Sequence, residues 1–345
     1  MKVLIESHVP FAEGAFGNEA EVAVLAPEEF TRQRLTEEKA DVIIVRTRTR
    51  CDASLLEGTN VSVVATATIG TDHIDIPYCQ SRGIEVVNAP GCNAPAVAQY
   101  VFAAVLRLLD GRKPEELTLG VVGVGHVGSI VADWGRQLGF RVLECDPPRA
   151  LREPGYTSIP LREIAEKADI ITLHTPHTKT GEHATHHLAD EAFFNALRRK
   201  PIFINAARGP VVDTPALLAA IDNGTVGAVV SDCWEGEPLI SREQLAKSRY
   251  ATPHIAGYSI EGKKRATQMT VNAILRHFGS DRRLDLGIPE GAAAKVTAES
   301  ILASYDPAVD TAALRRAFSD AENDEEAAKA FEFLRNNYPL RQEVR

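Results

Sequence analysis

Three polar residues in the second half of the chain could together move a proton and bind an anion. Arg208, Glu237 and His254 each follow a short apolar run. A histidine suits proton transfer because its unperturbed pKa of about 6.5 lies near neutral pH. A carboxylate beside it would hold one imidazole tautomer and favour the protonated form, and Glu235 competes with Glu237 for that role. An arginine can bind a substrate carboxylate through two parallel hydrogen bonds. The set suits the removal of a hydroxyl proton from a hydroxy acid as hydride leaves.

A glycine-rich segment in the first half of the chain indicates a dinucleotide-binding site. Residues 123–128 read GVGHVG, follow the apolar run Thr118–Val122 and precede a helix-length stretch. In this context the three glycines allow a tight turn, close approach of a pyrophosphate and packing of helix on strand. Asp146 ends the next apolar run and would accept hydrogen bonds from the adenosine ribose, which favours NAD over NADP. Arg149, three residues later, weakens that preference.

The apolar runs are short and continuous, which indicates strands buried on both faces of parallel sheets. The predicted strands are Val3–Ile5, Asp41–Val45, Val61–Ala65, Ile84–Asn88, Thr118–Val122, Arg141–Cys145, Ile170–Leu173, Ile202–Asn205 and Ala228–Ser231. Asn93–Leu109 is predicted to be a long buried helix, because it is apolar on nearly every side. A further helix is predicted over Ile260–Phe278.

These segments predict an α/β protein with two Rossmann-like or flavodoxin-like parallel-sheet domains, a deep cleft and a short α-rich C-terminal domain. Residues 1–93 and 259–285 are assigned to a discontinuous substrate-binding domain. Residues 94–258 are assigned to an NAD-binding Rossmann domain, and residues 286–345 to the C-terminal domain. The acidic run Asp320–Glu326 is interpreted as a solvated helix face.

The composition of the chain argues against several classes of protein. Its 345 residues carry 38 Lys and Arg against 47 Asp and Glu, a net charge of −9, so no nucleic-acid or membrane partner is expected. No apolar run approaches the roughly 18 residues of a membrane span, and the first residues do not resemble a signal peptide. The five cysteines are scattered without a C-x-x-C pair, which is typical of a reducing compartment. A cytoplasmic protein is expected.

The chain resembles the D-isomer-specific 2-hydroxyacid dehydrogenase family over about residues 40–280. The resemblance includes GTDHID at 70–75, GIEVVNAPGCN at 83–93, the glycine motif and the segments around Arg208, Glu237 and His254. It implies an NAD-dependent dehydrogenase in which Arg208 orients the substrate carboxylate, His254 is the acid/base and Glu237 supports the histidine. The implied cofactor-binding residues are Gly123, Gly125, His126, Val127, Gly128, Asp146, Thr175, Ala206, Asp232 and Gly257.

Several rarer segments point to one branch of the family, which acts on a small phosphorylated 2-hydroxy acid. They include DPPR at 146–149, THHLAD at 185–190 and HIAGYSIEG at 254–262. The resemblance to this branch implies substrate contacts by Thr47, Thr68 and Tyr258. It also implies a homodimer formed through the C-terminal domain, which is shorter here than is usual in that branch.

The stretch RTRTR at residues 46–50 supplies a separate prediction about the phosphate. Alternate residues of an extended segment share a face, so Arg46, Arg48 and Arg50 would point the same way. Arg46 is predicted to help neutralise the phosphate. Which of the three arginines binds it is left open.

Two other functions remain open on the sequence alone. One is a dehydrogenase for another D-2-hydroxy acid, such as D-3-phosphoglycerate, and the other is an NAD(H)-sensing regulatory protein on the same fold. No metal is expected, because His183, His186 and His187 have no carboxylate or cysteine at ligand spacing. Asp213 is predicted to cap a helix, and Cys92 to be structural.

Overall fold

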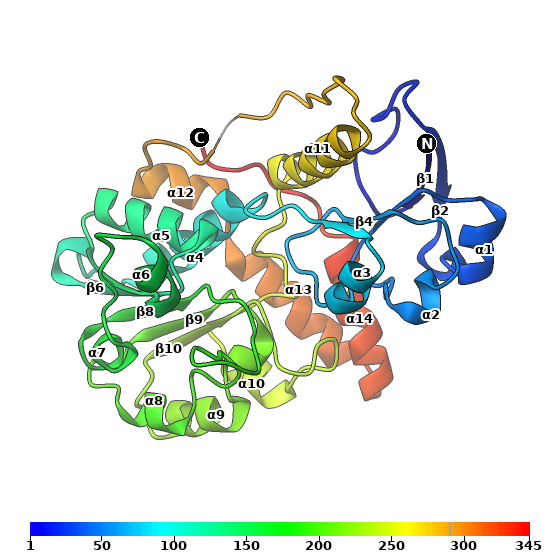
Figure 1. The fold of residues 1–345 in the computed structure, drawn as a ribbon. Coiled ribbons are helices and arrows are strands. Elements are labelled where there is room, and N and C mark those ends of the chain that lie inside the picture. The colour runs from blue at the N-terminus through cyan, green and yellow to red at the C-terminus, as the bar shows by residue number, and fades with distance from the viewer. Residues whose placement is uncertain (290) are drawn as a thin grey trace. The chain divides into compact units, whose positions relative to one another are not determined.

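The computed structural model describes residues 1–289 and 291–345, which form two compact units (Figure 1). Unit 1 comprises Met1–Asn93 and Ser259–Glu290, and unit 2 comprises Ala94–Tyr258 and Gly291–Arg345. Each unit contains one sheet of parallel strands. The expected fold class, two parallel-sheet α/β domains with a helical C-terminal region, is confirmed.

Unit 1 is built on a five-stranded sheet in the order β2-β1-β3-β4-β5. Its strands are β1 (Lys2–Glu6), β2 (Glu21–Leu25), β3 (Val42–Val45), β4 (Val63–Thr66) and β5 (Glu85–Val87). Its helices are α1 (Arg32–Glu37), α2 (Ala53–Leu56), α3 (Ile76–Ser81) and α11 (Ile260–His277), with the 3-10 turn η1 (Pro27–Glu29). Strands β3 and β4 are buried throughout, as their continuous apolar sequences predict. Strand β2 is a largely exposed edge strand that the apolar pattern did not predict.

Unit 2 is built on a six-stranded sheet in the order β11-β10-β9-β8-β6-β7. Its strands are β6 (Thr118–Val122), β7 (Arg141–Cys145), β8 (Ile170–Leu173), β9 (Ile202–Asn205), β10 (Ala228–Ser231) and β11 (Tyr250–Ala251). Helix α4 (Ala94–Leu108) and the 3-10 turn η2 (Pro114–Glu116) precede the sheet. The strands are connected by α5 (His126–Gln137), α6 (Pro147–Arg152), α7 (Leu161–Lys167), α8 (Glu191–Asn195), η3 (Gly209–Val211), α9 (Thr214–Asp222) and α10 (Arg242–Lys247). The strand order reverses at β6, which pairs with β7 and β8. Doubly wound sheets bind ligands at the carboxyl ends of the strands beside such a reversal.

Helix α4 is a buried helix of unit 2, as its composition predicts. Every residue from Ala94 to Val105 is buried. The helix packs against α5 and α12 (Ala298–Ser304), and the ring of Phe102 lies 6.4 Å from that of Trp134. A helix that is apolar on all sides is stable only when it is covered on all sides.

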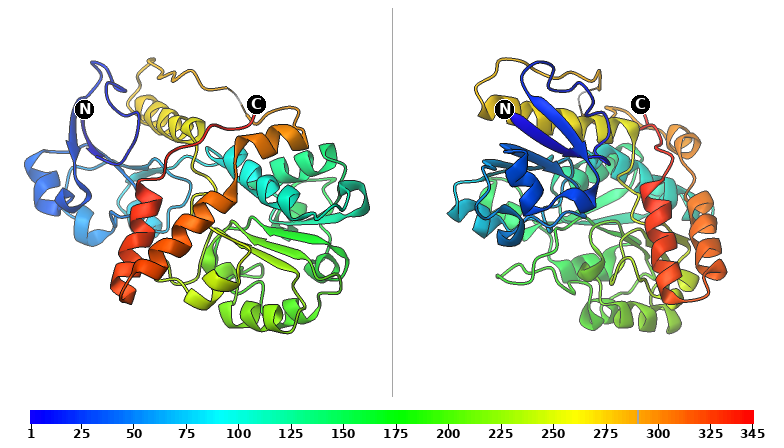
Figure 2. Two further views of the ribbon diagram at one scale, coloured as in Figure 1. Left: turned by 180° about the vertical axis from the view of Figure 1, so that it is seen from behind. Right: turned by 90° about the vertical axis from the view of Figure 1, so that its right-hand side faces the viewer.

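The C-terminal helices belong to unit 2, and their assignment to a C-terminal domain over residues 286–345 stays a prediction. Besides α12 they are α13 (Pro307–Asp320) and α14 (Asp324–Asn336), and two views show them alongside the rest of unit 2 (Figure 2). Phe318 and Phe331 pack with Trp234 in one apolar cluster. The acidic run is not one helix face, because α13 ends at Asp320 and α14 begins at Asp324 with Asn323 as its N-cap. Whether this region forms a dimer stays a prediction.

No helix in the described residues has the length and apolar character that would be needed to cross a bilayer. All five cysteines are buried thiols.

Candidate active site

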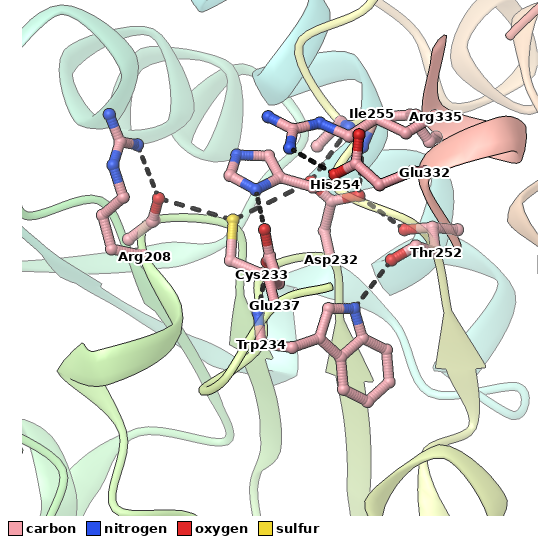
Figure 3. Close-up of polar contacts among 12 residues, drawn as sticks. Arg208, Asp232, Cys233, Trp234, Glu237, Thr252, His254, Ile255, Glu332 and Arg335 are labelled. Atoms are coloured by element: carbon pink, nitrogen blue, oxygen red, sulfur yellow. Dashed lines mark hydrogen bonds and ion pairs between the residues drawn. The ribbon is translucent and has the colours of Figure 1, made fainter. Parts of the chain in front are cut away.

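A histidine–carboxylate pair lies at the carboxyl ends of β10 and β11. The Nδ1 atom of His254 lies 2.8 Å from Oε2 of Glu237 (Figure 3). Their side chains are 25% and 19% exposed, so the pair is partly shielded but reachable. Because Nδ1 faces the carboxylate, Nε2 is the ring atom that can exchange a proton with a substrate.

Buried Asp232 fixes the loop that carries His254. Its carboxylate accepts hydrogen bonds from Thr252 Oγ1 at 2.6 Å, Ile255 N at 2.7 Å and Ala256 N at 3.0 Å. Its backbone oxygen accepts a bond from His254 N at 2.9 Å. His254 has a φ of +58°, a conformation that costs a residue with a side chain about 1–3 kcal/mol and persists where the surroundings hold it. The loop is therefore held in one conformation from both of its ends.

Glu237 is fixed by its second carboxylate oxygen. Oε1 accepts a hydrogen bond from Trp234 N at 2.7 Å, and the indole of Trp234 donates to Thr252 O at 2.8 Å. Both oxygens of Glu237 are thus hydrogen-bonded, one to the backbone and one to His254. This arrangement fixes the imidazole orientation as well as its tautomer.

The electrostatics of the pair favour a charged imidazole. Burial lowers the pKa of His254, but the Glu237 carboxylate, 2.8 Å from Nδ1, outweighs burial and holds that pKa well above its usual range. Burial raises the pKa of Glu237, and its contacts with His254 and Trp234 bring it below its usual value. Burial also raises the pKa of the Cys233 thiol. The pair is therefore suited to receive a proton at His254.

Arg208 lies in the loop after β9, near the pair. Its guanidinium Nη1 donates to Ala207 O at 2.8 Å, and the Cys233 thiol contacts the same carbonyl at 3.4 Å. Figure 3 shows Arg208 on one side of Cys233 and His254 on the other. The next residue must be glycine, because a Cβ on Gly209 would lie 1.9 Å from Trp234 O. Arg208, Glu237 and His254 thus come together as the sequence predicts.

The glycine segment has the shape that a dinucleotide pyrophosphate requires. Gly123 has a φ of +84°, and a Cβ on it would lie 2.8 Å from backbone atoms of His174 and Thr175. A Cβ on Gly128 would lie 2.0 Å from Gly123 O, whereas Gly125 faces open space. Close packing at the first and third glycines and space at the second leave room for a phosphate at the N-terminus of α5.

The two residues between Gly125 and Gly128 have different surroundings. His126 begins α5 and is exposed, whereas Val127 packs on the core of unit 2. Thr175 follows β8, and its buried Oγ1 has no hydrogen-bond partner in the described chain. A buried hydroxyl without a partner is costly, which suits an atom that meets a ligand. Ala206 is half-buried after β9, and Gly257 belongs to a turn closed by Tyr258 N and Ile255 O at 2.8 Å.

Asp146 connects the glycine segment to the next strand. Its Oδ2 accepts from Val124 N and its Oδ1 from Arg149 N, both at 2.8 Å. The side chain of Arg149 is bonded to Glu153 at 2.6 Å and lies 4.3 Å from the Tyr156 ring. Since that guanidinium is already paired, it offers little to a 2′-phosphate, and the expected weakening of NAD preference gains no support here.

The predicted phosphate and substrate residues of unit 1 follow β3 and β4. Arg46 donates its backbone N–H to Glu6 at 2.9 Å and its Nη1 to His8 O at 3.2 Å. Arg50 pairs with Asp52 at 2.6 Å. Thr47 and Arg48 are exposed. The hydroxyl of Thr68 lies 2.7 Å from that of Thr66. Their roles toward a substrate stay predictions.

Glu235, the histidines near residue 186 and Asp213 lie apart from the His254–Glu237 pair or have other partners. Glu235 does not compete for His254, because it bonds to His187 at 2.7 Å and to Thr214 N at 3.3 Å. His186 lies 3.2 Å from His177. Asp213 caps α9 by accepting from Ala216 N at 3.1 Å, as predicted.

Two residues near the pair were missed by the sequence analysis. Cys233 contacts the pair, and the ligand atoms of Cys233, Glu237 and His254 lie within 4.8 Å of one another, the one such group in the described chain. Arg335 of α14 is the other: it interacts with Glu237 and Tyr258. A cysteine next to the motif aspartate could have been noticed. Arg335 gave no signal, because it is one of several charges on a helix far along the chain.

Comparison with known sequences identifies the protein family that this chain matches. The model described as D-isomer specific 2-hydroxyacid dehydrogenase, NAD binding domain, matches residues 99–256. An erythronate-4-phosphate dehydrogenase of Bacteroides thetaiotaomicron is 45% identical over 350 residues, 99% of this chain and 97% of that protein. One of Marinobacter nauticus is 41% identical over 361 residues, 99% of this chain and 93% of that protein.

Comparison with solved structures gives the same fold. D-lactate dehydrogenase from Aquifex aeolicus, complexed with NAD and lactic acid, has a TM-score of 0.65 and 28% identity, covering 80% of this chain and 95% of that one. The holo form of Rhodotorula graminis D-mandelate dehydrogenase has a TM-score of 0.69 and 25% identity, covering 80% and 93%. Together with the glycine segment, these matches identify residues 99–256 as an NAD-binding domain.

Proposed function

The chain belongs to the D-isomer-specific 2-hydroxyacid dehydrogenases, in the branch of the erythronate-4-phosphate dehydrogenases, and we propose that it oxidises 4-phospho-D-erythronate with NAD. The product is (R)-3-hydroxy-2-oxo-4-phosphooxybutanoate, an intermediate of pyridoxal 5′-phosphate biosynthesis. The observation that carries the chemistry is the contact of 2.8 Å between His254 and Glu237, with Arg208 on a neighbouring loop. The full-length similarity to the relatives supports the substrate.

The proposed reaction separates a hydride and a proton at C2. Nε2 of His254 takes the proton of the C2 hydroxyl, and the carbonyl forms as hydride leaves C2. Glu237 stabilises the imidazolium that results. Arg208 binds the C1 carboxylate and draws electron density from the new carbonyl, which favours the transition state. Removal of the base alone would cost about 10²–10⁴-fold in rate.

NAD is the cofactor of this family, and its nicotinamide accepts the hydride when it is bound. Gly123, Gly125 and Gly128 would receive its pyrophosphate at the N-terminus of α5. Asp146 is held by two backbone N–H groups, so its remaining lone pairs would accept the ribose hydroxyls. Thr175 supplies a buried hydroxyl just after the adjacent strand β8. His126, Val127, Ala206, Asp232 and Gly257 complete the proposed cofactor-binding set.

The proposal also covers the substrate-binding residues, the oligomeric state and the location of the protein. Arg46, Thr47 and Thr68 are inferred to contribute to substrate binding, together with Tyr258. The C-terminal region is inferred to form a homodimer, and the protein to be cytoplasmic, as the resemblance and the cysteine pattern predict. Light scattering on a size-exclusion column tests the dimer: a monomer mass at micromolar concentration would contradict it.

Substrate preference tests the proposal directly. NADH formation is followed with 4-phospho-D-erythronate and with 3-phospho-D-glycerate, in the presence of a ketone trap that pulls the equilibrium forward. A clear preference for the four-carbon acid is expected. Preference for the glycerate would keep the chemistry and overturn the substrate. Turnover of neither, by protein shown to bind NAD, would favour a sensor.

A further inference from the structure

The chain after α14 is tied to the loop that carries His254. The buried side chain of Arg341 donates to Ile255 O at 3.1 Å, to Ala256 O, and to Ala96 O at 3.1 Å. Gln99 of α4 donates to Gln342 O at 3.0 Å. The C-terminal segment therefore helps to form the site.

The same segment contacts a predicted substrate residue. The ring of Tyr338 packs edge-on against that of Tyr258, with 6.2 Å between centroids. The hydroxyl of Tyr338 lies 3.3 Å from both Arg341 and Asp310, which fixes its position. Tyr258 is thus supported by the C-terminal segment of its own chain.

Arg335 of α14 brings a positive charge to this place. Its side chain is only 19% exposed, and Figure 3 shows its guanidinium beside His254, on the opposite side from Arg208. Its ion pair with Glu332, one turn earlier on the same helix, spans 3.8 Å, a loose contact compared with a bidentate pair. The Nε atom is buried without a hydrogen-bond partner among the described residues.

The guanidinium of Arg335 stays protonated although it is largely buried. Burial lowers its pKa, but interactions with Tyr258 and Glu237 outweigh burial and raise it above the usual value. A buried guanidinium whose N–H groups are incompletely used is costly for folding alone. Such a group is well suited to an anionic ligand.

The proposed substrate carries anions at both ends. Its C1 carboxylate is assigned to Arg208, and its C2 hydroxyl to His254. The phosphate on C4 is at the other end of the molecule. A cation on the far side of His254 from Arg208 therefore meets the requirement for the phosphate, and Arg335 occupies that place.

We propose that Arg335 binds the C4 phosphate and sets the preference for phosphorylated over unphosphorylated 2-hydroxy acids. This inference rests on the proposed function, and it assigns to helix α14 a part in substrate selection. Arg335 lies outside the NAD-binding domain at residues 99–256, so the domain shared with the wider family does not contain this selectivity. Arg46 remains a second candidate for the same dianion.

The test compares two substrates that differ only in the phosphate. The values of kcat/KM for 4-phospho-D-erythronate and D-erythronate are measured for wild-type protein, Arg335→Gln and Arg335→Lys. Arg335→Gln is expected to lose about 10- to 100-fold on the phosphorylated acid, the effect of one charged hydrogen bond. Most of that loss should be in KM, and D-erythronate should change less than about twofold. The kcat/KM of Arg335→Lys on the phosphorylated acid should lie between those of wild-type protein and Arg335→Gln, because lysine keeps the charge but not the planar donor pair.

Arg316→Gln is the matched control, since Arg316 is 85% exposed on α13 and contacts only Asp320 among the described residues, at 3.5 Å. Equal losses on both acids in the Arg335 variants would mean that Arg335 supports the loop rather than binding the phosphate. No loss on either acid would also overturn the inference. If Arg335→Gln does not fold, as judged by thermal melting, Arg335→Lys decides alone: an unchanged ratio between the two acids refutes the proposal. Wild-type protein inactive on both acids would instead refute the proposed function.

Discussion

Replacing Glu237 by glutamine should change the pH dependence of oxidation in a defined direction. Oxidation needs neutral His254, so the rate rises with pH through the apparent pKa of the imidazole, which Glu237 helps to keep high. An opposite charge within about 4–6 Å changes a pKa by about 1–3 units, and one unit corresponds to about 1.4 kcal/mol. The carboxylate lies 2.8 Å from Nδ1. The midpoint of the profile should therefore fall by about 1–3 pH units in Glu237→Gln.

The structure predicts a second effect of the same substitution. The two oxygens of Glu237 accept from Trp234 N at 2.7 Å and from His254 Nδ1. Glutamine has only one oxygen for these two donors. If its oxygen stays on Trp234, its amide nitrogen donates to Nδ1 and leaves the proton of His254 on Nε2, where it cannot accept another. The plateau rate should therefore fall by about 10²-fold, the lower end of the value of a general base.

Single-turnover NADH formation isolates the chemical step. It is measured between pH 5.5 and about 10, and the midpoint and plateau of the rate are fitted for each variant. Glu235→Gln is the control, because Glu235 lies on the same loop and bonds to His187 instead. Its midpoint and plateau should match those of the wild type. An unchanged midpoint in Glu237→Gln, or an equal change in both variants, would refute the reasoning.

Three further substitutions follow from the site. His254→Ala should lower kcat about 10²–10⁴-fold and leave NAD affinity, measured by fluorescence titration, unchanged; a smaller loss would place the base elsewhere. Arg208→Lys should lower kcat/KM about 10- to 100-fold, because a lysine cannot form the planar bidentate pair; equal activity in steady-state assays would contradict carboxylate binding. Asp146→Ala removes the charge that repels a 2′-phosphate, so the ratio of kcat/KM for NAD over NADP should fall about tenfold. An unchanged ratio would mean that another residue selects the cofactor.

The predicted strands agree best with the structure in unit 2, where β6, β7, β8, β9 and β10 have the predicted limits. In β8 and β9 the agreement has a physical reason, because a short, continuous apolar run between polar stretches is typical of a strand in a covered parallel sheet. Strand β2 was missed because it is an edge strand whose Val24 is 62% exposed. Strand β11 was missed because it has only two residues. Only β11 lacks an apolar run of the usual length, since residues 22–26 around β2 read VAVLA.

The candidate site was predictable where it depends on strand ends. Parallel strands place their carboxyl ends along one edge of a sheet, so Arg208, Glu237 and His254 had to approach one another. The distances between these side chains and the buried hydrogen bonds of Asp232 could be known only from the structure. Their catalytic roles stay predictions.

Arg335 could not be found in this way. Its helix carries many charges, and its sequence does not show which of them is buried. That depends on how Ala327 and Phe331, both fully buried, seat α14 against unit 2. Tertiary packing of a helix thus supplied the residue that local patterns could not.

Deuterium transfer from C2 tests the central claim most directly. The protein is given NAD and 4-phospho-D-erythronate that carries deuterium only at C2, and the NADH formed is analysed by mass spectrometry. We expect the deuterium to appear in NADH, because the hydrogen leaves C2 as hydride while His254 takes the hydroxyl proton. NADH without deuterium, or deuterium lost to water, would contradict direct hydride transfer from C2 and the roles assigned to this site.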